Sequence, residues 1–268
     1  MLQGTYLGIY INPVCEFWGS ALNCRFCTTG QNVGGAENAA KTVEDVVETC
    51  WAAKEESHVS FVHLNGGFQG GHALAFAEPF VRAIKEEVGM LVGVQLTPER
   101  DFSKYDRLID LGVDHFSFCV ELLDPQWFAR ICPGKARTLG QKLFFDAMAY
   151  CAARLPRGAV SGELIAGIEP ISLTIAGIER IAGLGAFPTV CIFRPTVGSH
   201  MADWAPLRTT RCAPSWRRCT TRAAGIGFLS GWRRTSRSAL SSTPTMRRFW
   251  HRGLRGSTRM KRGAARCA

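Results

Sequence analysis

The sequence has no long apolar run, no leader-like start and, over residues 206–268, no acidic residue. No stretch of about 18 or more uninterrupted apolar residues occurs, so no transmembrane helix is predicted. The first residues lack the basic region and the small-residue cleavage site that are typical of a secretory signal. We therefore expect a cytoplasmic protein that has no membrane partner.

A disulfide framework is also absent from the cysteine pattern. The 268 residues contain 11 cysteines, an odd number, and most are scattered through apolar segments. This usage is typical of reduced, buried thiols in one large globular domain. Only Cys15, Cys24 and Cys27 are clustered. Cys132 stands alone in "RICPGK", so the sequence gives no convincing second cysteine cluster.

The missing acidic residues divide the chain into two parts. Residues 206–268 contain 15 Arg and one Lys but no Asp or Glu, a net charge of +16. Residues 1–205 contain 16 Lys and Arg against 22 Asp and Glu, a net charge of −6. Two compositions therefore meet near Trp204, and we predict a core domain over 1–205 followed by an Arg-rich tail over 206–268.

Three interpretations of the tail stay open: a basic arm for nucleic acid, a disordered segment, and a frameshifted, non-native C-terminus. Its tryptophans and cysteines are unusual for the first two. With freely chosen codons and a shift of two nucleotides, 209–222 becomes an amphipathic helix, and 236–251 becomes a strand followed by a helix. We favour a frameshift from about residue 206 and expect no nucleic-acid partner. Sequencing the locus without finding a slipped base between codons 203 and 212 would reject it.

The first 205 residues alternate strand and helix. Apolar, β-branched runs predict strands, and helical spacing of apolar residues predicts helices between them. The expected strands are 5–11, 59–65, 90–96, 113–121, 159–169 and 187–196. The expected helices are 42–56, 73–88, 102–112, 140–155 and 173–185. This order predicts an α/β fold with parallel strands, either a doubly wound sheet or a (βα)6-type partial or complete TIM-like barrel.

Polar residues follow the predicted strands. In such folds the carboxyl ends of the strands share one rim, where chemistry is placed. The residues expected on this rim are Cys15, Cys24, Cys27, Asn65, Gly66, Gly67, Glu121, Glu169 and Arg194. Residues far apart in the sequence are thus predicted to form one ring.

The three clustered cysteines predict a metal site that is open at one position. Three thiolates can hold three irons of a [4Fe-4S] cluster and leave the fourth iron free for a small molecule. The loop has the spacing C-x8-C-x2-C, with Phe26 just before the last cysteine. It resembles a variant of the C-x3-C-x2-C loop of radical S-adenosylmethionine (SAM) enzymes, which shares the C-x-aromatic-C ending.

The resemblance to radical SAM enzymes extends over about residues 5–201. "NGGF" (65–68) resembles the Gly-Gly-Glu-Pro segment whose carbonyls receive the SAM amino group, with Phe68 and Gln69 in place of Glu and Pro. "GELIAGIE" (162–169) resembles the strand that packs on the adenine. "RPTVGSHM" (194–201) resembles a turn of the biotin-synthase-like branch. The order and placement of these segments carry the resemblance more than any single motif does.

The resemblance implies a specific chemistry and set of partners. A [4Fe-4S] cluster held by Cys15, Cys24 and Cys27 would cleave SAM to a 5′-deoxyadenosyl radical, which abstracts hydrogen from a small metabolite or cofactor precursor. Phe26, Asn65, Gly66, Gly67, Glu121, Glu169 and Arg194 are the candidate cofactor-binding residues. A reduced flavodoxin or ferredoxin-type protein is the expected electron donor. No catalytic residue is assigned.

Each feature has a simpler interpretation, and these alternatives remain open. The C-x2-C pair is compatible with a non-catalytic zinc or iron-sulfur module, with His63 or His72 recruited as a further ligand, or with a redox pair. The glycine cluster could bind phosphate, although it matches no known phosphate motif. Glu121 and Glu169 could be ordinary rim carboxylates, and Arg194 could be solvated or could bind a substrate carboxylate or phosphate. His58, His115 and Cys119 are expected to be structural.

Overall fold

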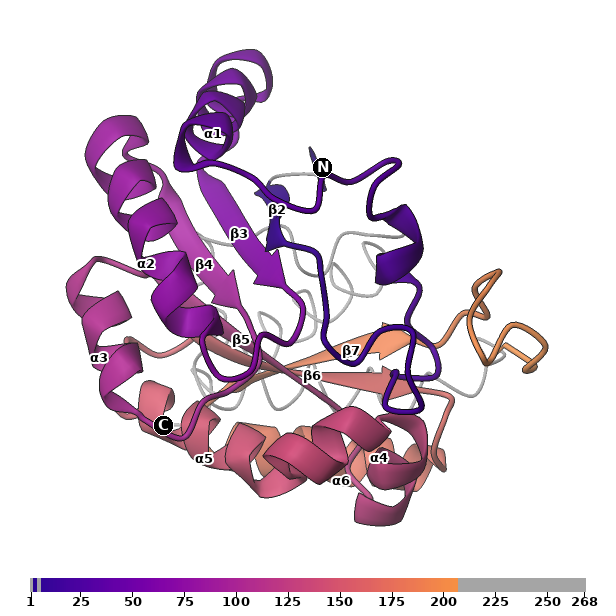
Figure 1. Cartoon of the computed structure of the whole chain (residues 1–268). Helices are drawn as coiled ribbons and strands as arrows, with labels where there is room; N and C mark the ends of the chain where they lie inside the picture. The colour runs from indigo at the N-terminus through magenta and orange to yellow at the C-terminus, as the bar shows by residue number, and fades with distance from the viewer. Residues whose placement is uncertain (1, 4–5, 207–268) are drawn as a thin grey trace, which may run out of the picture.

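The computed structural model describes residues 2–3 and 6–206. Most of the predicted Arg-rich tail therefore lies outside the described residues. One sheet of seven strands runs in the order β1 to β7, and helices line its outer side (Figure 1). The six strands β2 to β7 are parallel, and β1 pairs antiparallel with β2. The order shows no pairing of β2 with β7, so the described part is a partial barrel.

The strands fall close to their predicted positions. Their bounds are β1 (Leu2–Gln3), β2 (Tyr6–Asn12), β3 (Phe61–Gly66), β4 (Leu91–Gln95), β5 (His115–Glu121), β6 (Val160–Ala166) and β7 (Phe187–Ile192). Along β2 the buried residues alternate, with Leu7, Ile9 and Ile11 against the helices. The intervening side chains face the concave side of the sheet, because successive side chains on a strand point to opposite faces. The predicted α/β partial barrel is confirmed.

The helices are α1 (Val43–Ser57), α2 (Ala73–Ala83), α3 (Ser103–Asp110), α4 (Pro125–Ile131), α5 (Gln141–Ala152) and α6 (Ile171–Gly183). α1 starts where the sequence predicts, because Thr42 and Asp45 form a reciprocal capping box. α3 ends just before Gly112, which has a φ of 93°, a conformation that glycine adopts without strain.

Two features differ from the predicted helices. The helix expected over 73–88 is α2 followed by a π-helical turn, Ile84–Val88, that ends at Gly89. α4 is absent from the prediction, although Asp124 caps its N-terminus and Pro125 occupies its first position. That capping pattern is a recognised start signal. The helix is only seven residues long, so it shows no clear apolar period.

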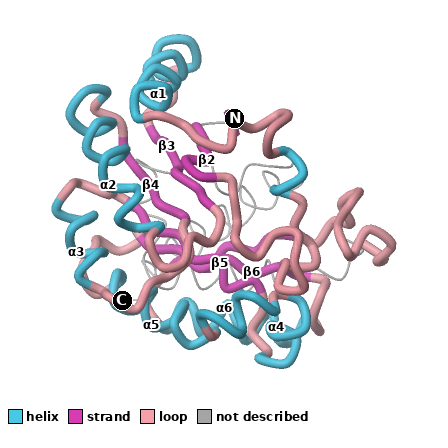
Figure 2. Tube along the Cα trace, viewed as in Figure 1, coloured by secondary structure: helices cyan, strands magenta, loops and turns pink. Residues whose placement is uncertain are grey.

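The core lies between the sheet and the arc of helices along its outer side (Figure 2). Its large buried side chains include Phe116, Phe118, Phe128, Phe144 and Tyr105. Among the described residues, every helix is too short or too polar to cross a membrane. This packing fixes the strands rigidly and leaves their carboxyl ends and the following loops to form the site.

Candidate functional site

The cysteine loop follows β2 and is fastened to the end of β3. The Phe17 ring stacks on Phe68, with ring centroids 4.3 Å apart and planes within 6°. The Glu16 amide donates to the Phe68 carbonyl at 3.1 Å. Gln69 accepts a hydrogen bond from Asn12 and donates one to the Val14 carbonyl. Phe68 and Gln69, which replace Glu and Pro of the radical SAM pattern, therefore position the cysteine loop.

Gly67 allows β3 and the cysteine loop to approach closely. A Cβ atom at this position would lie 2.4 Å from the Val14 carbonyl oxygen and 2.7 Å from Cα of Cys15. The Gly67 amide donates to the Asn12 carbonyl at 2.9 Å, which ties the same two segments together. No larger side chain fits without moving the loop, so the glycine is required by the backbone contact.

A single cavity of about 220 Å³ collects most of the predicted site residues. It is bounded by the cysteine loop, the end of β3 and the ends of β4 and β5. Its lining includes Cys15, Cys24, Phe26, Cys27, Asn65, Gly66, Gly67, Gln95, Cys119, Glu121 and Lys135. The structure thus brings together eight of the ten predicted residues in one place.

The three cysteine side chains surround the cavity without converging on one point. In the described part of the chain, no three His, Cys, Asp or Glu side chains lie close enough to hold a single metal ion. A cluster places each thiolate on a different iron, so its ligands stand apart around the cavity. The arrangement therefore fits an iron-sulfur cluster better than a single zinc ion, which gathers its ligands tetrahedrally.

Asn65 provides a buried acceptor in the cavity. Its amide nitrogen donates to the His63 carbonyl at 3.1 Å. Its side-chain oxygen is buried and accepts no hydrogen bond from the described residues. Leaving such an atom unpaired is costly, so a ligand that brings a donor, such as an amino group, would satisfy it. Asn65 lines the cavity, so this unpaired acceptor lies next to the space that a bound molecule would fill.

Glu121 and Lys135 form a buried ion pair in the wall of the cavity. Lys135 Nζ lies 2.6 Å from Glu121 Oε1 and also donates to the Cys119 carbonyl at 3.1 Å. Burial alone would lower the pKa of Lys135, but Glu121 and nearby sulfur atoms hold it well above its usual value. Glu121 ends β5 with a φ of 70° at a register shift. Such strain in a non-glycine residue is typical of functional sites.

The thiols differ in their tendency to ionise. A hydrogen bond from the Cys132 thiol lowers the pKa of Cys24, and the Lys135 charge adds to this, although burial opposes both. Burial raises the pKa of Cys27, partly offset by a hydrogen bond to Thr29. Metals and clusters bind the thiolate form, and Cys24 forms a thiolate more readily than Cys27 does.

Cys119 and Gln95 extend the site into the interior of the barrel. The Gln95 amide lies 3.0 Å from the Cys119 sulfur, whose thiol is 3.4 Å from Glu163 Oε2. Glu163 also accepts from the Ser117 hydroxyl at 2.9 Å, and burial raises the pKa of this carboxyl. Gln95 and Cys119 line the cavity, and Glu163 contacts Cys119 without being part of the lining.

Two predicted residues lie elsewhere. Glu169 is buried and accepts hydrogen bonds from the Leu123 and Asp124 amides at 2.9 and 3.0 Å, so it braces the loop after β5. Arg194 is exposed beyond β7 and is not among the residues that line the cavity. The turn that contains it contacts the cysteine segment through Gln31, which donates to the Gly198 carbonyl.

The cavity residues that were not predicted as ligand contacts include Lys135, Gln95 and Cys119. Gln95 ends β4 and Cys119 lies in β5, so the rim rule could have found both. Lys135 follows α4, a helix that the sequence analysis missed, and nothing in its local sequence marks it. Cys132, which the sequence left isolated, lies beside Cys24.

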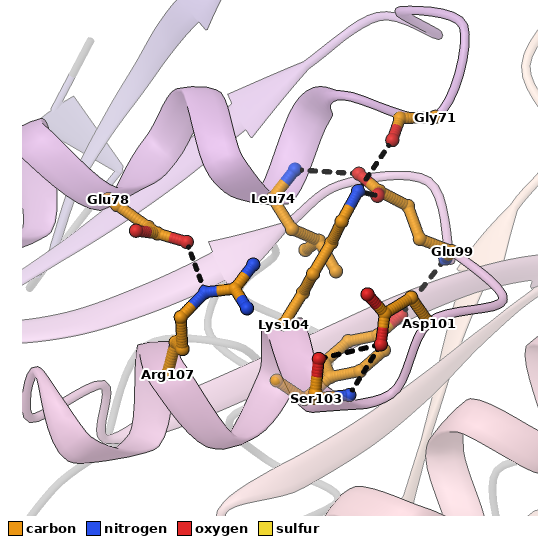
Figure 3. Close-up of polar contacts among 9 residues, drawn as sticks. Gly71, Leu74, Glu78, Glu99, Asp101, Ser103, Lys104 and Arg107 are labelled. Atoms are coloured by element: carbon orange, nitrogen blue, oxygen red, sulfur yellow. Dashed lines mark hydrogen bonds and ion pairs between the residues drawn. The ribbon is translucent and has the colours of Figure 1, made fainter.

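The loop after β3 is held from behind by a separate polar network (Figure 3). The buried Glu99 carboxylate accepts from the Leu74 amide at 2.9 Å and pairs with Lys104. Lys104 also donates to the Gly71 carbonyl at 2.9 Å. Because Leu74 lies in the first turn of α2, Glu99 both caps this helix and fixes the glycine loop that leads into it.

Comparisons with known proteins agree with this geometry. No protein-family model matches the chain. The bacteriochlorophyllide c C-7(1)-hydroxylase of Chlorobaculum limnaeum is 22% identical over 228 residues, which cover 74% of this chain and 56% of that protein. The chain therefore spans little more than half the length of this curated relative.

Solved structures share the fold. Methylornithine synthase PylB matches with a TM-score of 0.64 and 18% identity, over 81% of this chain and 62% of PylB. The FeFe-hydrogenase maturase HydG from Carboxydothermus hydrogenoformans matches with a TM-score of 0.65 and 16% identity, over 84% of this chain and 51% of HydG. A radical SAM methyltransferase from Sphaerobacter thermophilus gives 0.58 and 15%, over 81% and 62% of the two chains. The resemblance that the sequence indicated is therefore confirmed: the described chain has the fold of the radical SAM enzymes.

Proposed function

We propose that this chain is a radical SAM enzyme whose cysteine loop holds a [4Fe-4S] cluster through Cys15, Cys24 and Cys27. The observation that carries the proposal is the shared cavity, in which all three thiols meet the Asn65-Gly66-Gly67 segment. When bound, the cluster supplies the electron, and SAM the 5′-deoxyadenosyl group, with which such enzymes remove a hydrogen atom from a substrate. The fold of the solved relatives supports this assignment.

The residues of the cavity would position SAM beside the cluster. The Asn65 side-chain oxygen is a free acceptor for the amino group, and Gly66 and Gly67 keep the β3 end narrow enough for backbone contact. Lys135 lines the cavity and donates to Glu121 and to the Cys119 carbonyl, so one of its three N–H donors is left for a bound carboxylate. Phe26 covers the cluster loop with an apolar ring, and Glu169 and Arg194 are left as candidates for contacts beyond the cavity.

A cofactor precursor or other small metabolite is the proposed substrate. The curated relative is named for hydroxylation of a bacteriochlorophyllide, which is a cofactor precursor. Gln95 and Cys119, which line the cavity, would lie on the substrate side, with Glu163 next to Cys119. Glu163 would offer a substrate either a proton or a hydrogen-bond acceptor, depending on its ionisation.

The partners are also part of the proposal. A reduced flavodoxin or ferredoxin-type protein would supply the electron, and the reduced thiols and cluster suit the cytoplasm. The core domain 1–205 would hold the cofactors. The tail from 206 onward stays assigned to a frameshift product, and we propose that it contributes nothing to SAM binding.

Electron paramagnetic resonance tests the proposal. The anaerobically reconstituted, dithionite-reduced chain should give a [4Fe-4S]⁺ signal that SAM perturbs. Cys24→Ala should abolish the signal, because the cluster loses one of three ligands. A matched control, Cys50→Ala, removes a buried thiol on α1 outside the cavity and should leave the signal unchanged. A colourless chain that binds zinc instead would favour the alternative, a non-catalytic metal module.

A further inference from the structure

A fourth cysteine faces the cysteine loop from α4. Two hydrogen bonds join the segments: the Arg25 amide donates to the Ile131 carbonyl at 2.9 Å, and the Gly134 amide to the Leu22 carbonyl at 3.0 Å. These two hydrogen bonds flank Cys24 in one segment and Cys132 in the other. A disulfide requires Cα atoms about 4.4–6.8 Å apart, so it needs two segments held in this kind of close backbone contact.

Close packing fixes this approach. A Cβ atom at Gly134 would lie 2.6 Å from the Leu22 carbonyl oxygen and 2.6 Å from the Phe17 ring, so only glycine fits there. The Arg25 side chain adds a hydrogen bond to the Arg130 carbonyl at 2.6 Å. Cys132 is fully buried, and its thiol interacts with the sulfur of Cys24, which lines the cavity. The two thiols therefore face each other in a rigid setting.

We propose that Cys24 and Cys132 form a reversible disulfide when the cluster is absent. In the oxidation by glutathione disulfide, the Cys24 thiolate attacks one sulfur and releases a glutathione thiolate. The Cys132 thiolate then attacks the Cys24 sulfur of the mixed disulfide, so the second glutathione leaves. Two protein thiols and one glutathione disulfide thus become one protein disulfide and two reduced glutathiones.

The consequence for the site rests on the proposed function. A cluster needs Cys24 as a thiolate, so the disulfide would close the site to iron until it is reduced. The same bond would protect Cys24 from irreversible oxidation to sulfinic acid.

Peptide mapping tests the disulfide without any cluster. The cluster-free full chain is treated with glutathione disulfide, alkylated and digested with trypsin and a Glu-specific protease. Cleavage after Glu16, Arg25, Arg130 and Lys135 isolates Cys24 in 17–25 and Cys132 in 131–135. The expected product is 17–25 linked to 131–135, released by dithiothreitol. Linkage of 17–25 to the Cys15 or Cys27 peptide, or no linkage, would overturn the proposal.

Two variants control the mapping. Cys132→Ser should lose the link, whereas Cys151→Ser, which alters another fully buried thiol, should keep it. Iron loading then tests the consequence: the oxidised wild-type chain should take up almost no iron, and reduction with dithiothreitol should restore its uptake. Full iron loading of the oxidised chain would reject the inference that the disulfide closes the site to iron. Failure of the reduced chain to load would reject the proposed function and leave the mapped disulfide standing.

Discussion

The two ends of the barrel interior are built differently although the same strands form both. At the carboxyl end, β3 and β5 present Asn65 and Glu121 to a polar cavity. Deeper inside, the same strands present His63 and His115, whose ring centroids lie 5.6 Å apart. Phe61 and Tyr6 pack edge-on around these rings.

The difference shows two ways of handling buried polar groups. At the cavity, Glu121 is paired with Lys135, with 2.6 Å between the Lys135 nitrogen and the Glu121 oxygen. In the aromatic cluster, neither imidazole forms an ion pair with another described residue. Burial lowers the pKa of His63 to about 3 and that of His115 to about 4, although the Asp114 charge partly opposes the second shift. One end thus keeps charge available for a ligand, and the other excludes charge and fills space.

The largest expected effect comes from breaking the charge pair. Lys135→Met leaves the Glu121 carboxylate buried without a cation, which should lower the free energy of unfolding by about 3–5 kcal/mol. Urea unfolding at pH 7 measures this change. If the ion pair is the cause, adding Glu121→Gln to Lys135→Met should recover most of the loss. A single variant as stable as wild type would show that the carboxylate is already solvated.

The glycine that narrows the cavity should give a smaller but more local effect. Gly67→Ala places a Cβ against two backbone atoms, so the loop must shift at a cost of about 1–3 kcal/mol. We expect a cluster content well below that of wild type in iron and sulfide assays, because Cys15 moves with the loop.

Gly183→Ala is the matched control for this substitution. Gly183 ends α6, and a Cβ there meets nothing within 4 Å. Alanine is the better helix former, so stability should rise by up to about 1 kcal/mol, with cluster content unchanged. Equal cluster losses in both variants would mean that Gly67 acts through general stability and not through the cavity.

The sequence predicted the parts of the fold that depend on local pattern. The six parallel strands and five of the six helices follow from apolar periodicity and caps such as Thr42. The residue types and spacing of the cysteine loop and of the glycine segment indicate their chemistry directly. Their placement on one rim follows from parallel topology alone.

The missed contacts depend on packing between distant segments. Lys135 reaches Glu121 across 14 residues, and Cys132 reaches Cys24 through hydrogen bonds that no periodicity encodes. Glu169 is a residue that was predicted but whose partners were not. Its place after β6 predicts a carboxylate on the rim, but the sequence does not show that two loop amides donate hydrogen bonds to it. Side-chain partners at this range follow from the three-dimensional fold and not from strand order.

The smallest expected effect tests the closed, uncharged end. His63 and His115 resist protonation in the folded chain but accept a proton near pH 6.5 when unfolded. Stability from these two residues is therefore complete above pH 6.5 and is lost as the pH falls below it. Between pH 6.5 and pH 5 each histidine should lower the free energy of unfolding by about 2 kcal/mol.

The variant His63→Phe isolates one of these contributions. The ring keeps its packing and loses a buried nitrogen that has no partner among the described residues, so stability at pH 7 should hold or rise. The fall in unfolding free energy between pH 6.5 and pH 5 should shrink by about 2 kcal/mol. His200→Gln, at an exposed site, should keep the wild-type fall. An unchanged fall in His63→Phe would mean that water reaches the aromatic cluster, and the contrast between the two ends would no longer hold.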